Sequence, residues 1–311
     1  MKVLVAGASG FLGRNFCAFL EQGGHQAVGL LRTVPAEPAF DFLLAPDLAS
    51  LRQLDLSHGR FDAIVNAAGG GVNPLDRAGS GLMEANVLLP VALVEKAAES
   101  GVGALVQIGS SAEYAPVPSG LLIRESAELE THKLYGATKA AGTIAALGLA
   151  SHLRVPAMVL RSFNLFGVGE APHRLLPAIV RQLSAGAEVP LSVGTQIRDF
   201  VAVGEACAAI VAALTALLQD SALVGVYNLS TGVGTSVADF ARTVARALGA
   251  DEELLQFGAI PMRADDTAWV VGAPDRLRRA TGWTARPDLE QAIGDVARQE
   301  LRRVTRKEVQ S

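Results

Sequence analysis

A glycine-rich segment directly behind the first apolar run constrains the fold more than any other feature. The run KVLVAG (2–7) predicts a buried strand, and GASGFLG (7–13) opens an amphipathic helix. Gly7 permits a tight turn, Gly10 lets the backbone approach a pyrophosphate, and Gly13 lets helix and strand pack closely. Free amides at the helix N-terminus then face the phosphates. This order predicts a dinucleotide site built from Gly7, Ser9, Gly10, Phe11, Leu12 and Gly13.

Short apolar runs alternate with amphipathic stretches through the first half of the chain. The expected strands are 3–6, 27–31, 40–44, 63–67, 104–108 and 157–161, and the expected helices are 11–22, 82–100 and 134–152. Several strands are continuously apolar, as parallel strands covered on both faces should be. The pattern predicts an α/β fold, a Rossmann-type doubly wound parallel sheet, with the dinucleotide-binding domain over 1–162.

The second half is less regular. Helices are expected at 175–185, 205–219 and 237–248, the last with Ser236 as its N-cap. We interpret 163–311 mainly as a smaller C-terminal substrate-binding lobe. The segment GVYNLS (225–230) is expected to return to the main sheet as a strand.

Composition and charge exclude several classes of protein. Hydrophobic residues make up 50% of the chain and charged residues 19%, too little charge for a disordered protein. A net charge of −4 argues against nucleic-acid binding. No apolar run reaches the roughly 18–20 residues of a membrane span, and no signal peptide is recognisable, so we expect no membrane association and a cytoplasmic location. Cys17 and Cys207 are expected to be buried thiols, and the five histidines show no ligand spacing, so no metal is expected.

Residues behind the second, third and fourth expected strands bear on the cofactor. Arg32 stands where an acidic residue would bind the ribose of NAD, and a guanidinium suits a 2′-phosphate, so NADP(H) is favoured and NAD(H) is possible. A solvated arginine is the alternative. Asp47 and Leu48 are placed to contact adenine, and the small Ala67 and Ala68 leave room for the nicotinamide ribose. Asn86 is expected to be either a helix N-cap or a site-ordering residue.

The segment YGATK (135–139) places Tyr135 and Lys139 on one face of a helix. A phenol has a pKa near 10, and a nearby ammonium lowers that pKa, so the pair suits proton exchange with a carbonyl or an alcohol. Ser110 ends the fifth expected strand, where ligands of open α/β sheets bind. Ser111 is the alternative to Ser110, and Glu113 is expected to line the substrate side or to cap the turn.

In order and spacing, these motifs resemble the extended short-chain dehydrogenase/reductase superfamily, in its NAD-dependent epimerase/dehydratase branch. The resemblance covers nearly the whole chain. It implies catalytic roles for Ser110, Tyr135 and Lys139, with Lys139 also holding the nicotinamide ribose. The motifs that carry it are GASGFLG (7–13), NAA (66–68), Asn86, SSAEY (110–114), YGATK (135–139), RSFNLFG (161–167), RDFVAV (198–203), VYNLSTG (226–232) and LRRATGW (277–283).

The resemblance also implies a nucleotide-linked sugar as substrate. Asn164 matches a position near the sugar diphosphate, and Arg198 and Arg263 match positions that approach the nucleotide or its diphosphate. The sugar 4,6-dehydratases carry Thr-Asp-Glu where this chain has Ser110, Ser111 and Ala112, so dehydration is not expected.

Three functions follow from this resemblance. The chain is most similar to NDP-4-keto-6-deoxyhexose reductases, such as those acting on GDP-4-keto-6-deoxymannose. This predicts an NADPH-dependent 4-ketoreductase with Tyr135 as proton donor. The alternative is an NAD-dependent NDP-sugar 4-epimerase that uses the same three residues, and a non-catalytic dinucleotide sensor is a remote third.

The expected helix that begins near Leu134 carries almost no charge after Lys139, in the run AAGTIAALGLA. A helix that is apolar all round must be covered on both sides. One side is expected to meet the sheet. The other is expected to meet a partner subunit together with the helix at 88–98, which gives a homodimer.

Overall fold

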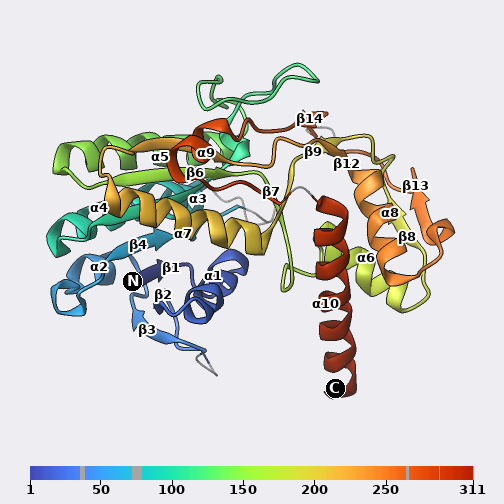
Figure 1. The fold of residues 1–311 in the computed structure, drawn as a ribbon, viewed down its shortest axis with the longest axis horizontal. Coiled ribbons are helices and arrows are strands. Elements are labelled where there is room, and N and C mark those ends of the chain that lie inside the picture. The colour runs from blue at the N-terminus through green and yellow to red at the C-terminus, as the bar shows by residue number, and fades with distance from the viewer. Residues whose placement is uncertain (36–38, 72–78, 264–265, 287, 311) are drawn as a thin grey trace.

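A parallel sheet forms the centre of the larger lobe (Figure 1). The computed structural model describes residues 1–35, 39–71, 79–263, 266–286 and 288–310. Within these residues the sheet has seven strands in the order β11, β6, β5, β4, β1, β2, β3. All six expected strands are confirmed, with ends that differ by at most two residues. They are β1 (Lys2–Ala6), β2 (Gln26–Leu31), β3 (Asp41–Leu44), β4 (Ala63–Asn66), β5 (Ala104–Ser110) and β6 (Ala157–Ser162).

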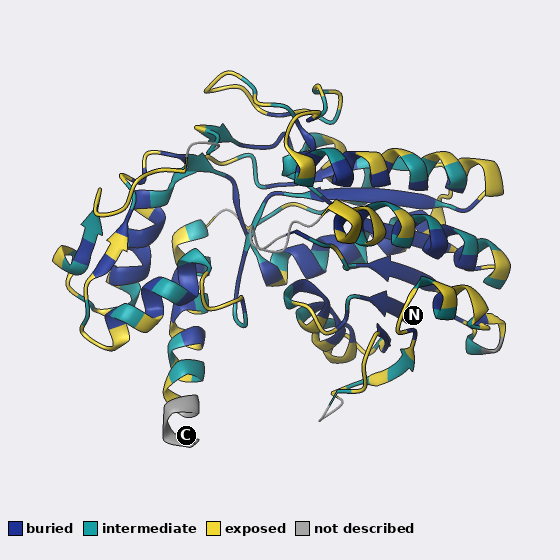
Figure 2. Cartoon of the chain, turned by 180° about the vertical axis from the view of Figure 1, so that it is seen from behind, coloured by how far each residue is buried: buried dark blue, intermediate teal, exposed yellow. Residues whose placement is uncertain are grey.

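Helices cover both faces of the sheet because its strands are apolar on both faces. Successive side chains of a strand point to opposite sides, and Val3 and Val5 join one core cluster whereas Leu4 and Ala6 join the other. Figure 2 shows the buried strands between helices with exposed outer surfaces. One face carries α1 (Phe11–Gln22), α7 (Val203–Gln219) and α9 (Asp275–Thr281), and the other carries α2 (Leu48–Gln53), α4 (Leu89–Ser100) and α5 (Leu134–Leu153).

The chain returns to the larger lobe after it has entered the smaller one. Strand β11 (Gly225–Leu229) lies parallel to β6 at the sheet edge, in the segment expected to return. Helix α7 was expected in the smaller lobe, but its buried residues belong to the same core cluster as Phe16 of α1 in the larger lobe. Its long apolar face covers a sheet rather than the compact core of the smaller lobe. The segment 163–311 is therefore shared between the two lobes.

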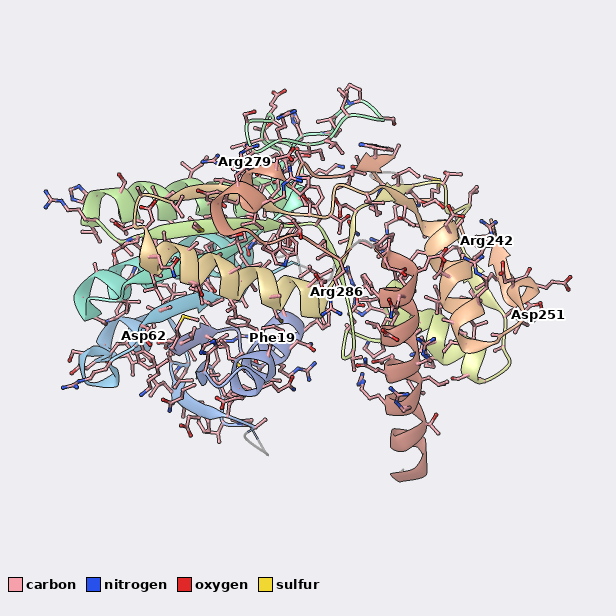
Figure 3. The ribbon with its side chains drawn as sticks, in the orientation of Figure 1. Phe19, Asp62, Arg242, Asp251, Arg279 and Arg286 are labelled. Atoms are coloured by element: carbon pink, nitrogen blue, oxygen red, sulfur yellow. The ribbon has the colours of Figure 1, made fainter. Side chains whose placement is uncertain are left out.

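The smaller lobe has a core of its own, centred on three phenylalanines. The rings of Phe200 and Phe240 stack with centroids 4.2 Å apart, and Phe166 meets Phe240 edge-on at 5.3 Å. Helices α6 (Leu175–Ser184), α8 (Val237–Leu248) and α10 (Leu289–Gln310) pack around them. Arg242 and Asp251 lie in this lobe, at the opposite end of the molecule from Asp62 (Figure 3).

Outside the main sheet, the described residues form three small sheets of short strands. Most pair strands that are far apart in the sequence, and none was expected from the sequence because runs of two or three residues carry little periodicity. They are β7 (Asn164–Phe166) with β10 (Phe200–Ala202), β8 (Val189–Leu191) with β13 (Leu255–Phe257), and β9 (Ile197–Arg198) between β12 (Thr235–Ser236) and β14 (Trp269–Val270).

Candidate active site

The turn between β1 and α1 has the shape that a pyrophosphate requires. Gly7 has a φ of +78°, and a Cβ there would lie 2.6 Å from the backbone nitrogen of Ala68. A Cβ on Gly13 would collide with the carbonyl oxygen of Gly7. Gly10 caps α1 without a side-chain hydrogen bond, so the first amides of the helix are left for a ligand. The exposed Ser9 and Gly10 and the half-buried Phe11 follow this turn, and the buried Leu12 begins the packing of α1 on the sheet.

The residues expected around the adenosine half lie at the ends of β2 and β3. Arg32 follows β2 directly and is exposed. Asp47 is the N-cap of α2, where its carboxylate accepts hydrogen bonds from the backbone N–H and the hydroxyl of Ser50, each at 2.7 Å. These bonds lower the pKa of the Asp47 carboxyl. Leu48 is half-buried at the start of the same helix.

The loop after β4 is shaped by a buried asparagine. Asn66 donates to Oε1 of Gln107 at 2.7 Å and accepts the backbone N–H of Ala68 at 3.0 Å. Ala67 and Ala68 are half-buried behind it. A Cβ on Gly69 would lie 3.6 Å from Nζ of Lys139, so this loop runs beside the expected lysine.

Asn86 orders this loop and does not cap a helix. It lies in a π-helical turn, η3 (Glu84–Leu88), between α3 (Gly79–Met83) and α4, where its side chain is 1% exposed. Its Oδ1 accepts the Gly70 N–H at 3.0 Å, and its Nδ2 donates to the Thr138 hydroxyl at 3.1 Å. The N-cap interpretation is wrong because the helical backbone already runs through this residue.

The structure brings Ser110, Tyr135 and Lys139 to one end of the sheet. Ser110 ends β5, and its hydroxyl accepts the backbone N–H of Ala112 in the short helix η4 (Ser111–Glu113). Half-buried Tyr135 stands in the first turn of α5. The next residue, Gly136, has no room for a Cβ because the carbonyl oxygen of Ala112 occupies that space. The start of α5 therefore lies directly against the turn that follows Ser110.

Lys139 is buried beneath this contact. Its Nζ donates to the carbonyl oxygen of Ile108 at 2.8 Å, and the residue is 6% exposed. Burial lowers the pKa of Lys139, and the charge of Glu113 partly opposes that effect. Such an ammonium can both hold a ribose hydroxyl and favour ionisation of a neighbouring phenol.

Glu113 does not line a substrate surface. The residue is 0% exposed and forms an ion pair with Arg161 of β6 at 2.7 Å. Its other oxygen accepts the backbone N–H of Ser110, which completes a capping box at η4. The expectation that it caps the turn is confirmed, and the expected substrate contact is corrected: a carboxylate so fully enclosed cannot meet a ligand.

The residues expected around the sugar nucleotide lie at the junction of the two lobes. Ser111 is half-buried on η4 beside Ser110, and Asn164 is half-buried at the start of β7. Arg198 of β9 forms an ion pair with Asp266. Burial lowers the pKa of Arg198, and Asp266 opposes this shift. Arg263 is exposed, next to residues 264–265, which lie outside the described part of the chain.

Asp199 was missed as an organiser of this junction. It is 0% exposed and accepts the backbone N–H groups of Thr231, Gly232 and Gly272 and the hydroxyl of Thr231. Burial raises the pKa of Asp199 against these four donors. The acceptor fixes the loop after β11 against the strand that carries Arg198. The RDF motif (198–200) contains Asp199, but from the sequence a role was expected only for its arginine, Arg198.

No helix among the described residues combines the length and the apolar character needed to cross a membrane. No group of three or more His, Cys, Asp and Glu side chains among them is arranged to hold a metal ion.

Known proteins resemble this chain along almost its whole length. The model of the NAD dependent epimerase/dehydratase family matches residues 3–230. The dTDP-6-deoxy-L-talose 4-dehydrogenase (NAD(P)(+)) of Kitasatospora kifunensis is 30% identical over 308 residues, which cover 95% of this chain and 94% of the relative. The UDP-glucose 4-epimerase of Corynebacterium glutamicum is 26% identical over 319 residues, with 95% and 94% covered.

The solved structures agree with these relatives. The UDP-glucose-4-epimerase from Stenotrophomonas maltophila, with bound NAD and formylated UDP-arabinopyranose, is 26% identical. It superposes with a TM-score of 0.86, covering 99% of this chain and 99% of that one. The similarity therefore includes both lobes and the junction between them.

Proposed function

The chain belongs to the NAD dependent epimerase/dehydratase family, and from this premise we propose that it is an NADPH-dependent 4-ketoreductase of a nucleotide-linked 4-keto-6-deoxyhexose. It is an enzyme of the extended short-chain dehydrogenase/reductase type. The relatives from Kitasatospora kifunensis and Stenotrophomonas maltophila are named for nucleotide sugars and a nicotinamide cofactor. The arrangement that carries the proposal is the contact of η4 with the start of α5. This contact offers hydroxyl groups at Ser110, Ser111 and Tyr135 and no carboxylate at Ser111 or Ala112.

The chain's own residues supply the proton side of this reaction. When the cofactor is bound, its nicotinamide supplies the hydride to C4 of the sugar. The Tyr135 hydroxyl gives its proton to the C4 oxygen, and the Ser110 hydroxyl donates a hydrogen bond to the same oxygen. Buried Lys139 favours the phenolate that remains and binds the nicotinamide ribose. The acid of η4, Glu113, is 0% exposed, so η4 offers no carboxylate that could take a sugar proton in an elimination.

The cofactor preference is proposed from the end of β2. Exposed Arg32 stands where the adenosine ribose would lie, and a guanidinium binds a 2′-phosphate through paired charge-assisted hydrogen bonds. The relative from Kitasatospora kifunensis is named for both cofactors, NAD(P)(+). Gly7, Gly10 and Gly13 suit the pyrophosphate of either cofactor, so Arg32 is the residue that would discriminate.

The nucleotide end of the substrate is assigned to the junction of the two lobes. Arg198 and Arg263 would neutralise the diphosphate, and Asn164 and Ser111 would donate hydrogen bonds to the diphosphate and the sugar. Arg198 is already oriented by Asp266. Its position on β9 is fixed in turn by the buried Asp199, the next residue along the chain.

Consumption of reduced nicotinamide tests this function. Purified protein is mixed with NADPH or NADH and a panel of NDP-4-keto-6-deoxyhexoses, and absorbance is followed. We expect stoichiometric oxidation of NADPH with one sugar and slower oxidation of NADH. Tyr135→Phe should lower kcat by about 10²–10⁴-fold and leave the Kd for NADPH unchanged. Tyr227→Phe is the matched control, since Tyr227 is a buried tyrosine of β11 to which the proposed reaction gives no role. No oxidation of either cofactor would reject a reductase.

A 4-epimerase is the second candidate, and it is supported by the relatives that carry this name. They include the Corynebacterium glutamicum protein and the Stenotrophomonas maltophila structure, each 26% identical. An epimerase would retain tightly bound NAD through purification and interconvert two NDP-sugars without net consumption of cofactor. Release of NAD on denaturation, with no NADPH oxidation, would favour this function over the ketoreductase.

We also propose that two copies pair through α4 and α5. These helices pack side by side on one face of the sheet. Their outer surface is apolar, with Ile144 of α5 60% exposed and Leu88, just before α4, 45% exposed. Surfaces of this kind on adjacent helices suit a symmetric partner of the same shape.

A further inference from the structure

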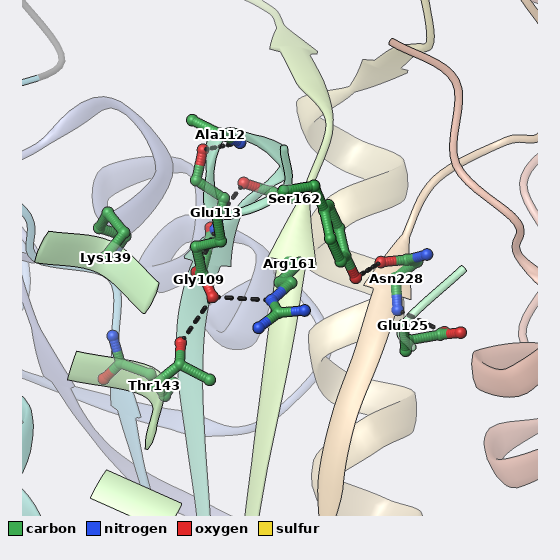
Figure 4. A network of polar contacts seen from close by, with 12 residues as sticks. Gly109, Ala112, Glu113, Glu125, Lys139, Thr143, Arg161, Ser162 and Asn228 are labelled. Atoms are coloured by element: carbon green, nitrogen blue, oxygen red, sulfur yellow. Dashed lines mark hydrogen bonds and ion pairs between the residues drawn. The ribbon is translucent and has the colours of Figure 1, made fainter. Parts of the chain in front are cut away.

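A carboxylate lies fully enclosed directly behind the proposed catalytic serine. Glu113 ends η4, three residues after Ser110, and is 0% exposed (Figure 4). The packing around it is tight, since a Cβ on Gly109 would lie 2.5 Å from its Oε1. A charge in such a place is costly unless every lone pair has a donor, so its partners indicate its role.

Three elements meet at this carboxylate. Oε1 accepts the backbone N–H of Ser110 at 2.9 Å, at the end of β5. Oε2 accepts the hydroxyl of Thr143 in α5 at 2.8 Å and Nε–H of Arg161 in β6 at 2.7 Å. The serine and the helix that carries Tyr135 are therefore fixed to the same group.

Thr143 lies one helical turn after Lys139, so both side chains leave the same face of α5. Lys139 donates to the carbonyl oxygen of Ile108, and Thr143 donates to Glu113. Both acceptors belong to β5 or to the turn that follows it. Helix α5 is thus attached to β5 at two successive turns, once through a backbone carbonyl and once through Glu113.

We propose that Glu113 is a positioning residue of the reaction: its carboxylate fixes Ser110 relative to α5 and places a negative charge at Thr143, one helical turn from buried Lys139. The inference rests on the proposed function for its catalytic meaning. The effect of Glu113 on Lys139 involves residues of this chain alone, so it can be measured without turnover.

The charges around Lys139 support this role. Burial lowers the pKa of Lys139, and the charge of Glu113 raises it. Arg161, which neutralises the other side of Glu113, also stacks on the ring of Tyr114 at 4.5 Å. Burial raises the pKa of Tyr114 to about 12, so its phenol stays neutral and donates to Asn228. Of the other titratable groups described, Glu125 acts on Tyr114, Glu130 lies against Gly136, and Tyr135 is the residue before Gly136.

The titration of Lys139 tests the proposal directly. The chain has five lysines, Lys2, Lys96, Lys133, Lys139 and Lys307, so lysine labelled with ¹³C at Cε gives few NMR signals. Lys139→Arg assigns the signal of Lys139. In Glu113→Gln we expect its titration midpoint to fall by about 1 pH unit or more, because an opposing charge at close range is lost. An unchanged midpoint would overturn the proposal.

Glu130→Gln is the matched control. Glu130 is a second carboxylate, 5% exposed, just before α5, where it accepts the backbone N–H groups of His132 and Lys133. The charge that raises the pKa of Lys139 is that of Glu113, so Glu130→Gln removes a nearby buried carboxylate without removing that charge. The Lys139 midpoint should stay within about 0.3 pH units in this variant. An equal fall in both variants would mean that burial alone, and not Glu113, sets the charge of Lys139.

Two further variants separate position from charge. Thr143→Val removes one bond to Glu113 without changing any charge, so kcat should fall while the Lys139 titration stays constant. If Glu113→Gln leaves Arg161 unpaired and unfolds, Glu113→Gln/Arg161→Met removes both charges together and should still lower the midpoint. If the unchanged protein turns over no sugar, the proposed function fails, and the titration still decides the role of Glu113.

Discussion

At the scale of single residues, glycines allow close backbone contacts between the elements of the site. The backbone nitrogen of Ala68 lies where a Cβ on Gly7 would be, and the carbonyl oxygen of Ala112 lies where a Cβ on Gly136 would be. Gly142 is similarly enclosed by the carbonyl oxygen of Asn86. Each contact joins a helix or turn to a different part of the site. The glycines therefore set the distance between cofactor loop, serine turn and tyrosine helix.

Gly136→Ala should separate this packing effect from helix propensity. Alanine favours a helix over glycine by about 1 kcal/mol, but the new methyl group would push α5 away from η4. We expect kcat to fall at least about tenfold, since a displacement of about 1 Å can cost 10²-fold. Gly148→Ala in the same helix meets no atom within 4 Å and should raise the free energy of unfolding with kcat unchanged. Equal activity of both variants would show that the contact is dispensable.

At the scale of elements, the packing of α1 against α7 encloses two thiols. Cys17 of α1 is 0% exposed and Cys207 of α7 is 1% exposed, and both are free. Burial raises the pKa of each thiol from the ordinary 9.0 to about 12, and Cys17 adds to the rise at Cys207. Both thiols therefore stay neutral in the folded protein across the physiological range.

This burial predicts a loss of stability at alkaline pH. Above about pH 9 the thiols of the unfolded chain ionise while those of the folded chain do not, so unfolding releases protons and becomes easier as pH rises. The stabilisation is complete below pH 9.0 and is lost toward pH 12. Between about pH 8 and pH 10, the free energy of unfolding should fall by up to about 2–3 kcal/mol more than in Cys17→Ala/Cys207→Ala. Urea unfolding at each pH measures this. An equal fall of the free energy of unfolding in both proteins would contradict the prediction.

At the scale of the whole molecule, the chain crosses between the lobes more than once and so holds them together. It leaves the sheet after β6, returns through α7 and β11, leaves to form α8, returns with α9 and leaves again to form α10. Arg14 and Asn15 of α1 donate to the carbonyl oxygens of Gly169 and Val168, behind β7. Gly169 in turn donates to buried Glu300 of α10. These links tie the first helix of the larger lobe, through the loop after β7, to the last helix of the smaller lobe.

The proposed pairing of α4 and α5 belongs to this scale. Ile144→Asp places a charge in the centre of the apolar surface, and burying an unpaired carboxylate at an interface is strongly unfavourable. We expect the protein to change from dimer to monomer at micromolar concentration, as measured by sedimentation velocity. Ile260→Asp changes a comparably exposed isoleucine, 46% against 60%, in the smaller lobe and should leave the dimer intact. If the protein without substitutions is itself a monomer at this concentration, the proposed pairing is rejected.

The sequence by itself determined the parts that depend on local order. Strands apolar on both faces, the GASGFLG turn and the Tyr135–Lys139 spacing follow from neighbours within one or two turns. The same local patterns indicated Ser110 at the end of β5, because the strand could be located from its composition.

Only the tertiary structure decided which polar groups are buried and what they hold. Glu113 faces inward because Arg161, 48 residues away, supplies its counter-charge. Tyr114 is held by Asn228, 114 residues away. Asn86 is not an N-cap, because its side chain is bonded to Gly70 and Thr138. Helix α7 packs in the larger lobe because its apolar residues cover one face of the sheet. A buried polar group is stable only beside its partners, and those partners meet only when distant strands come together.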